Sequence, residues 1–402
     1  MSKMILHDYG GHPFTGQLAR ALAARGNAMV YAWFAGFSGP KGRMGGVEHA
    51  GFRAVPLDIG GPFDKDNLVR RGLQQREYAR VVAALVLQER PDEVLSANAP
   101  IEVQEALQRA CARVGARFVF WLQDIHSEAI GRIIGKKNDG LGKLAGTYFR
   151  ARERRVLQAS DAVIAIADAF LDVLGGEPWR MDTAGMEVIE NWAPLEDIPL
   201  LPRDNDWAQA NLRPAQKRIV YTGTLARKHN PDLLLYLARN LEADVYLFSE
   251  GSSADHVSAV AASEGLDNMI VRPWVDVDDL PSVLASADIL YAVIEEDAGV
   301  FSVPSKVLSY LAAGRAILGS IPTNNLAAQT ICRAEAGRVV APDDVDGLLR
   351  DARALLGDDA ARAEMASNAR AYAERTFHIA NIAGRFEDVL NERVGQTKLA
   401  AE

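Results

Sequence analysis

The sequence predicts an α/β protein built from two doubly wound parallel sheets, and three observations support this prediction. Short apolar runs alternate with helical stretches along most of the 402 residues, which is the pattern of βαβ units. The alternation breaks once, over residues 191–217, where prolines predict a linker, and then restarts. The length suits two domains of ordinary size. We expect ligands beyond the carboxyl ends of the strands, in a cleft that the two domains face.

The first half of the chain predicts five strands separated by helices. Thr15 is the expected N-cap of the first helix, which should end at Arg25 before Gly26. Further helices are expected over 74–89 and 101–114. The expected strands cover residues 4–7, 28–34, 93–97, 117–122 and 162–167.

The second half repeats the alternation. The expected strands cover residues 218–223, 244–249, 269–272, 288–294 and 316–320, and the expected helices include 232–241, 344–356, 359–375 and 380–393. These limits predict an N-terminal domain over 1–195, a C-terminal domain over 196–378 and a final helical segment over 379–402.

Composition excludes several classes of protein. Apolar residues make up 49% and charged residues 24%, as in ordinary soluble globular proteins, and the net charge of −9 argues against nucleic-acid binding. Cys111 and Cys332 form neither a disulfide framework nor a Cys/His metal cluster. No signal peptide and no apolar run of about 20 residues is visible, so we expect a cytoplasmic protein.

The first expected strand leads into a turn with two adjacent glycines, Gly10 and Gly11. Glycine lets the backbone approach a ligand closely, and the helix start that follows offers free N–H groups to an anion or a hydroxyl-rich ligand. The spacing is not the G-x-G-x-x-G of dinucleotide-binding proteins. The alternative is a plain tight turn.

Two further turns carry polar side chains at expected strand ends. His126 follows the strand over 117–122, where an imidazole could exchange hydrogen bonds with a ligand near neutral pH or have a structural role alone. Arg227 and Lys228 follow Thr224 in the loop after the strand over 218–223. Two cations beside a helix start suit a diphosphate, and a solvated basic loop is the alternative.

The densest group of polar residues follows the strand over 288–294. Glu295, Glu296 and Asp297 come first, where sugar hydroxyls could bind, although acids before a helix are also ordinary. A helix start follows, where serines can act as caps and free N–H groups suit phosphate. That helix start comprises Ser302, Val303, Pro304, Ser305 and Lys306.

Taken in order, these features resemble the retaining glycosyltransferases of family 4, which have the GT-B fold. The resemblance is to the bacterial branch that builds capsules, exopolysaccharides and O-antigens. Its most specific match is VPSKVLSYLAAGRAIL over 303–318; the others are the Gly10-Gly11 loop and the segments 160–170, 188–194, 220–235, 337–344 and 369–377. The resemblance implies two Rossmann-like domains facing a cleft, the first binding the acceptor and the second the nucleotide-sugar. The final helix would cross back to the first domain.

By position, the resemblance also implies roles for individual residues. Gly11 would let the donor phosphate approach, His126 would lie beside the sugar, and Lys228 would hold the diphosphate. The backbone over 302–306 would cradle phosphate, and Trp274-Val275 lies where such enzymes bind the base.

The sequence departs from the family pattern at three positions. Thr224 stands where the family usually has arginine, and Phe301 and Ser309 stand where it has paired glutamates. Glu296 or Asp297 could replace the first glutamate from a longer loop.

We expect no metal, and no cofactor other than the nucleotide-sugar donor, for which UDP is the favoured base. Asp276-Val277-Asp278 spells the metal-binding Asp-x-Asp of another sugar-transferase fold. Here it precedes a helical stretch, and capping of that helix is the expected role.

Residues 132–155 form an unusually basic segment, with eight Lys/Arg and two acids among apolar side chains. Such a segment can lie on an anionic membrane surface. The alternative is a solvated helix whose apolar face packs on the sheet.

These expectations combine into one function with two alternatives. The leading hypothesis is a retaining, metal-independent hexosyl- or N-acetylhexosaminyltransferase, with His126, Lys228 and Glu296 as catalytic residues. It would move a sugar from a UDP-sugar to a saccharide or lipid-linked saccharide in cell-surface polysaccharide synthesis. The alternatives are a nucleotide-sugar-binding protein without turnover and a nucleotide-sugar 2-epimerase, because fold alone does not decide function.

Overall fold

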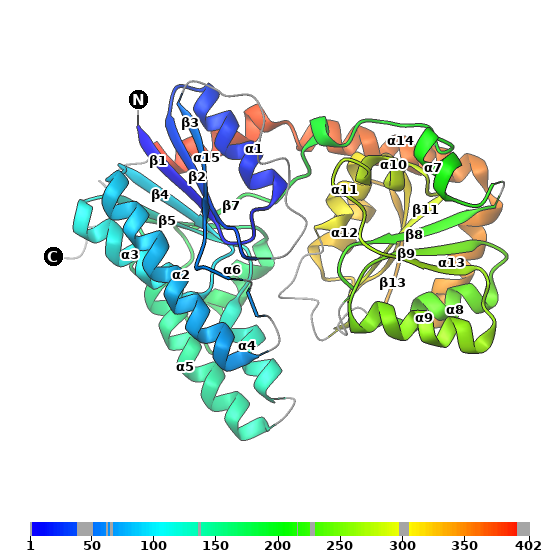
Figure 1. Cartoon of the computed structure of the whole chain (residues 1–402), viewed down its shortest axis with the longest axis horizontal. Helices are drawn as coiled ribbons and strands as arrows, with labels where there is room; N and C mark the ends of the chain where they lie inside the picture. Colours follow the sequence, from blue (N-terminus) through cyan, green and yellow to red (C-terminus); the bar gives the residue numbers. More distant parts are fainter. Residues whose placement is uncertain are drawn as a thin grey trace. The chain divides into compact units, whose positions relative to one another are not determined.

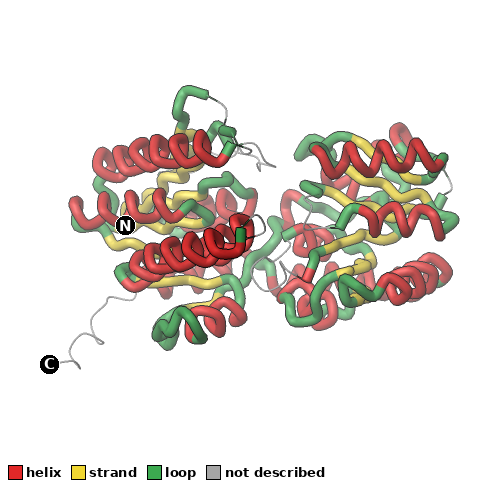
Figure 2. The backbone as a smooth tube through the Cα atoms, turned by 90° about the horizontal axis from the view of Figure 1, so that it is seen from below, coloured by secondary structure: helices red, strands yellow, loops and turns green. Residues whose placement is uncertain are grey.

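The computed structural model describes residues 2–37, 51–61, 63–64, 67–135, 138–214, 216–225, 230–296 and 305–391. The chain divides into two compact units (Figure 1). The first unit joins Met1–Glu190 to the C-terminal segment Ile379–Glu402, and the second is Asn191–His378. Each unit has a parallel sheet with helices on both of its faces (Figure 2), as the sequence predicts.

The first unit contains a seven-stranded sheet in the order β3-β2-β1-β4-β5-β6-β7, with all neighbours parallel. Its strands are Lys3–Asp8 (β1), Ala28–Phe34 (β2), Phe52–Leu57 (β3), Glu93–Ala97 (β4), Arg117–Leu122 (β5), Ala162–Ala165 (β6) and Glu187–Val188 (β7). The limits expected for β2, β4 and β5 are confirmed. The prediction missed β3 and β7, because β3 is a half-exposed edge strand that contains Pro56 and β7 has two residues.

Seven helices accompany this sheet among the described residues. They are Pro13–Ala24 (α1), Leu68–Glu89 (α2), Ile101–Val114 (α3), His126–Gly135 (α4), Asp139–Gln158 (α5), Asp168–Gly175 (α6) and Ile379–Asn391 (α15). Two expected starts are wrong. α1 begins at Pro13, so Thr15 lies inside the helix and is not its N-cap. α2 begins at Leu68, because the side chain of Asn67 accepts hydrogen bonds from the backbone N–H groups of Val69 and Arg70.

The basic segment over 132–155 belongs to two helices that pack closely, rather than to one. α4 and α5 run alongside each other (Figure 1), and glycines face each other where they meet. A Cβ added at Gly142 would lie 2.4 Å from the Cα of Gly135, and one at Gly131 would lie 3.2 Å from the Cα of Gly146. Larger residues at these positions would force the two helices apart.

α15 packs against the first unit although it is the last described helix of the chain. The ring of Phe386 lies 4.7 Å from that of Trp121 on β5, measured between centroids. The Arg25 side chain, which follows α1, pairs with Glu387 at 2.6 Å, and Arg117 donates to the carbonyl of Leu390. Apolar and polar contacts therefore both hold the helix on this unit.

The second unit contains a six-stranded parallel sheet in the order β10-β9-β8-β11-β12-β13. Its strands are Arg218–Thr222 (β8), Asp244–Phe248 (β9), Met269–Arg272 (β10), Ile289–Val293 (β11), Ala316–Ser320 (β12) and Gly337–Val340 (β13). The limits expected for β10 and β12 are confirmed. The sequence did not predict β13 as a strand, because it is an edge strand that is short, begins with glycine and is half-exposed.

The described helices of this unit include a short 3₁₀ helix, Leu195–Asp197. The α-helices are Asp206–Asn211 (α7), Asp232–Asn240 (α8), Ser252–Glu264 (α9), Leu280–Ala285 (α10), Lys306–Ala312 (α11), Leu326–Arg333 (α12), Val345–Gly357 (α13) and Asp359–Thr376 (α14). The C-terminal helices expected from the sequence match α13, α14 and α15 to within two residues at each end.

The proline-rich segment over 191–217 is not a free linker but a packed part of the second unit. Arg370 on α14 donates to the carbonyl of Ile198, and Arg315 donates to that of Leu201. The Arg203 guanidinium forms two hydrogen bonds of 3.0 and 2.8 Å with the carboxylate of Asp288.

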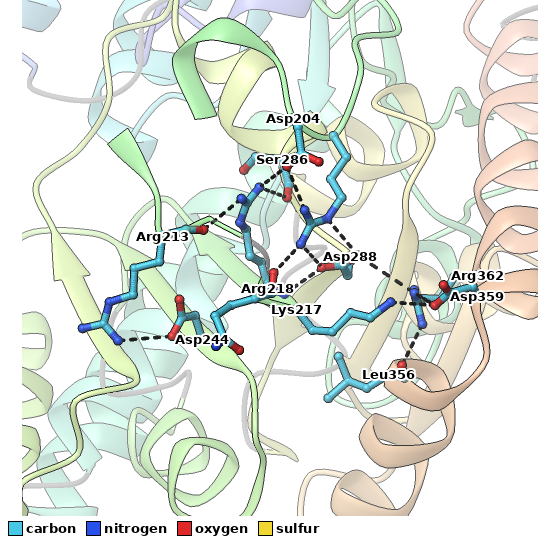
Figure 3. Close-up of polar contacts among 12 residues, drawn as sticks. Asp204, Arg213, Lys217, Arg218, Asp244, Ser286, Asp288, Leu356, Asp359 and Arg362 are labelled. Carbon is cyan, nitrogen blue, oxygen red and sulfur yellow. Dashed lines mark hydrogen bonds and ion pairs between the residues drawn. The ribbon is translucent and has the colours of Figure 1, made fainter. Parts of the chain in front are cut away.

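Charged side chains gather where β8 and β9 begin (Figure 3). Arg218, which is 2% exposed, donates from its backbone N–H to Asp288 and from its guanidinium to the carbonyls of Ser286 and Arg213. Its guanidinium also lies 3.2 Å from Asp204. A buried cation needs such partners to offset its lost hydration, so the amino edge of this sheet has a structural role.

Candidate functional site

The strand orders place a topological switch point in each sheet. In the first sheet the order turns between β1 and β4, and in the second between β8 and β11. Crossover helices leave in opposite directions at such a point, which opens a crevice at the carboxyl ends of the two strands. The loops after these four strands therefore carry the residues of interest, and they contain Gly10, Gly11, Thr224 and Glu296 from the predicted set.

The loop after β1 is organised by a buried carboxylate, Asp8, which is 0% exposed. Asp8 accepts hydrogen bonds from the backbone N–H groups of Gly10 and His12 and from the Thr15 hydroxyl. It also pairs with Nδ1 of His12 at 3.0 Å. A single acceptor thus fixes the turn, the first turn of α1 and the orientation of the imidazole.

This pairing changes the acidity of both groups. Burial lowers the pKa of His12, but the charge of Asp8 and its hydrogen bond outweigh burial and leave that pKa raised. Burial likewise raises the pKa of Asp8, but His12 and the hydrogen bonds to the carboxylate leave it lowered. The pairing therefore favours the charged form of both groups.

The two glycines of the loop meet two different demands. A Cβ at Gly10 would lie 2.3 Å from Cε1 of His12, so the imidazole occupies the space that a side chain would need. Gly11 has φ +70°, the left-handed region that glycine tolerates best. The structure thus assigns Gly10 to the packing of His12, which the sequence did not reveal.

His126 is the first residue of α4, half-buried, and its position depends on a residue of α5. The carboxylate of Glu153, which is 1% exposed, accepts hydrogen bonds from the N–H groups of His126 and Ser127 at 3.0 and 2.9 Å. Burial raises the pKa of Glu153, and the charge of His126 and these hydrogen bonds partly offset that rise. Glu153 is one of two acids in the basic segment, and it caps α4.

In the second unit, Tyr221 links two of the predicted residues. Its hydroxyl donates to the carbonyl of Thr224 at 3.0 Å, and the ammonium of Lys306 lies 3.5 Å from the centre of its ring. Gly223, which lies between Tyr221 and Thr224 in the sequence, has φ +96°. Thr224 and Lys306 therefore lie at the same end of β8.

Trp274 and Val275 follow β10, at the carboxyl edge of the same sheet. Trp274 is 39% exposed, and its backbone N–H donates to the carboxylate of Glu250, which follows β9. Glu296 is exposed and follows β11. An exposed indole beside a carboxylate offers a stacking surface and a hydrogen-bond acceptor.

Several predicted residues lie outside the described part of the chain. These are Arg227, Lys228, Asp297, Phe301, Ser302, Val303 and Pro304. Ser305 is described and occupies the N-cap position of α11, but its hydroxyl makes no capping hydrogen bond, so the expected capping role is wrong.

The Asp-x-Asp segment over 276–278 precedes α10. The N-cap of α10 is Asp279, which lies outside this segment, and its side chain makes no capping hydrogen bond, so the segment does not supply the expected N-cap. Within the described ranges, no cluster of three or more His, Cys, Asp and Glu side chains could hold a metal ion.

Two family profiles match the chain, one in each unit. The family described as "Glycosyl transferase 4-like domain" matches residues 10–192, and that described as "Glycosyl transferases group 1" matches residues 216–358. The chain belongs to the glycosyltransferases of the GT-B fold. The family resemblance that the sequence suggested is confirmed at this level.

One curated protein and two solved structures are similar to this chain, and the two structures show that the fold is shared. WcaI of Escherichia coli (strain K12), whose name describes a glycosyl transferase of colanic acid biosynthesis, is 24% identical over 308 residues, covering 74% of this chain and 73% of WcaI. Sucrose-phosphate synthase of Thermosynechococcus elongatus superposes with a TM-score of 0.74 at 15% identity, over 97% and 98% of the two chains. Anabaena HepE, solved with UDP and glucose, superposes with a TM-score of 0.69 at 14% identity, over 98% and 100%.

Five site residues were not singled out from the sequence. One is Asn98, whose Nδ2 lies 3.5 Å from Nε2 of His12, and the others are Asp8, His12, Glu153 and Glu250. Asp8 reads as the polar end of a strand and Glu153 as one charge of a helix face. Glu250 follows an expected strand end, and Asn98 directly follows another, so position alone could have drawn attention to both.

We predict that replacing Asp8 by Asn lowers the pKa of His12 below its ordinary value. The substitution removes the charge that outweighs burial, so burial then dominates. Imidazole NMR titration of the variant and the wild-type chain measures this shift. A His12 pKa that stays raised in the variant would contradict the pairing, and His256, on the surface of α9, provides an internal control that should not change.

Proposed function

We propose that this glycosyltransferase moves a hexosyl or N-acetylhexosaminyl group from a UDP-sugar to a saccharide or lipid-linked saccharide, with retention at the anomeric carbon. The observation that carries the proposal is the match of both units to glycosyltransferase profiles, with polar loops at the switch point of each sheet. The UDP and glucose in complex with HepE, and the colanic acid role in the name of WcaI, support a UDP-sugar and a surface polysaccharide.

The donor nucleotide would bind at the carboxyl edge of the second sheet. The exposed indole of Trp274, with Val275 beside it, offers a surface for the base, and Glu250 offers an acceptor. Thr224 and the ammonium of Lys306 meet at Tyr221. In the sequence, Arg227 and Lys228 follow Thr224 closely, and residues 302–304 precede Lys306. Cations and helix N–H groups at one strand end suit a diphosphate.

The proposed chemistry needs charge stabilisation rather than a protein nucleophile. The acceptor oxygen forms a bond to the anomeric carbon on the same face from which the leaving group departs. The bond between that carbon and the phosphate oxygen breaks. The electron pair goes to UDP, which also takes the acceptor proton. Lys228, assisted by Arg227, stabilises the charge that develops on the diphosphate, so the reaction is proposed to need no metal.

Two other residues have roles in this proposal. His126, held by the Glu153 cap of α4, hydrogen-bonds the transferred sugar. Glu296 takes the place of the first glutamate of the family and accepts a hydrogen bond from a sugar hydroxyl.

The acceptor is proposed to be carried on lipid at the inner face of the cytoplasmic membrane, with α4 and α5 as the contact. Leu141, Leu144 and Tyr148 lie on one face of α5 and are 57–68% exposed. The side chain of Lys143 is 77% exposed, but Lys143 lies one residue from Leu144 and therefore off this apolar face of the helix. No described helix is long and apolar enough to cross a membrane.

The charges of the basic segment divide into two groups. Arg150 pairs with Glu128, and Arg152 pairs with Glu102 and Glu105, so these cations are partly neutralised within the unit. Lys143 also pairs with Asp139, at 2.8 Å, but both of these side chains are more than three quarters exposed. This exposed pair is therefore the one that an anionic lipid surface could replace most easily.

A transfer assay with a radiolabelled UDP-sugar and a lipid-linked acceptor tests the function. We expect transfer by the wild-type chain and a loss of about 10²-fold in turnover in Lys228→Ala, because one charge-stabilising group is removed. Lys217→Ala, which removes a cation just before the other end of β8, serves as the control and should keep its activity. Donor binding without transfer would support the alternative of a binding protein, and epimerisation of the donor without acceptor would support the 2-epimerase.

We predict that His126→Ala lowers kcat by roughly tenfold or more and changes KM less. An interaction that strengthens in the transition state acts on kcat. The variant keeps the backbone N–H that Glu153 binds, so α4 should keep its start. Steady-state kinetics beside the surface variant His256→Ala measures the effect; a change in KM alone would contradict the assigned role.

We predict salt-sensitive binding of the protein to anionic vesicles and weak binding to neutral ones. Exposed charges are screened beyond about 8 Å at physiological ionic strength, so high salt should release the protein. Co-sedimentation of Lys136→Glu/Lys137→Glu/Lys143→Glu should show no binding. The same reversal at Arg350, Arg353 and Arg375, which lie on the exposed surface of the second unit, should have little effect. Equal binding to neutral vesicles would contradict the prediction.

A further inference from the structure

We infer that His12 and Asn98 together bind a hydroxyl group of a sugar substrate at the switch point of the first sheet. The inference rests on the proposed function, and it adds a binding pair that lies outside the family motifs. The sugar can be that of the donor or that of the acceptor, and the experiment below separates the two.

The fold brings the two side chains together from positions 86 residues apart. Asp8 on β1 is the register partner of Ala97 on β4, so the loops that follow these residues start side by side. Nε2 of His12 lies 3.5 Å from Nδ2 of Asn98. Both residues are half-buried, which leaves their polar atoms within reach of a ligand.

The imidazole is held so that Nε2 remains available. A carboxylate only accepts hydrogen bonds, so the Nδ1 that faces Asp8 carries the proton. The absence of a side chain at Gly10 leaves room for the ring, because a Cβ there would lie 2.3 Å from its Cε1. Asp8, Gly10 and His12 therefore act as one unit that presents Nε2 at a fixed position.

The backbone of Asn98 has an uncommon conformation. Its φ is +48°, in the left-handed region, which asparagine tolerates better than most residues. A residue held in a sparsely populated conformation at a strand end is a common feature of binding sites.

The chemistry of the pair favours a hydroxyl over a phosphate. A hydroxyl can donate and accept at once, and the amide and the imidazole together offer both functions. The 3.5 Å contact is long, so a hydroxyl that bonds both groups at ordinary distances would improve on it. Asp8 lies directly behind the ring, and the charge of Asp124 also reaches His12. The charge of Asp8 offsets that of a protonated His12, and Asp124 adds a second negative charge, so the position has no net positive charge to attract an anion.

Three substitutions test the pair. His12→Asn keeps a polar group for Asp8 but removes the outer nitrogen, whereas His12→Gln keeps a polar group near the position of Nε2. Asn98→Gly removes the amide and tolerates the positive φ. His256→Asn, on the surface of α9, is the matched control, and thermal unfolding verifies that each variant is folded.

The measurements are the affinities for UDP and UDP-glucose, by calorimetry, and binding to an immobilised glycan array in the presence of UDP. We expect unchanged affinity for UDP in all variants. His12→Asn and Asn98→Gly should weaken either UDP-glucose binding or glycan binding by about tenfold, the effect of losing one neutral hydrogen bond, and His12→Gln should lose less. A loss with UDP-glucose assigns the hydroxyl to the donor, and a loss on the array assigns it to the acceptor.

Two outcomes would overturn the inference in distinguishable ways. If the wild-type chain binds UDP-glucose or glycans and the folded variants bind them equally well, the pair has no such role, while the proposed function stands. If the wild-type chain binds neither, the proposed function and the pair both fail.

Discussion

Both sheets of this glycosyltransferase are parallel and covered on both faces, and this burial restricts where polar chemistry can occur. Strands such as β5, β8 and β11 are buried along nearly their whole length. A polar side chain within such a strand must find a hydrogen-bond partner in the core, as His7 does with Ser96 and Tyr78. Charged and ligand-binding groups therefore concentrate at the strand ends.

The two ends of the strands have different uses. At the amino edge of the second sheet, Arg218, Arg203 and Asp288 neutralise one another and attach the proline-rich segment to the unit. Such a network is satisfied from within and offers little to a ligand. At the carboxyl edges, groups such as Trp274 and His12 are partly exposed, so they can offer a stacking surface or a hydrogen bond to a ligand.

Two buried carboxylates organise the loops of the first unit. Asp8 holds the turn after β1 together with the start of α1, and Glu153 holds the start of α4. Each satisfies several N–H groups that would otherwise lack partners at a helix start. The loops that carry Gly11 and His126 are consequently positioned by residues that do not themselves need to touch a substrate.

The sequence by itself determined the α/β class, the central strands and the turns that carry Gly10, Gly11 and Thr224, whereas His126, expected in a turn, begins α4. These features follow from local periodicity and from glycine and proline positions, which a single segment contains. It could not reveal that Gly10 accommodates His12, that Glu153 caps α4 or that residues 191–217 pack on the second unit. Those contacts join residues that strand register and crossover connections bring together, and register depends on the burial of whole sheets rather than on any one segment. Only the tertiary structure could therefore decide which polar side chains meet at the switch point.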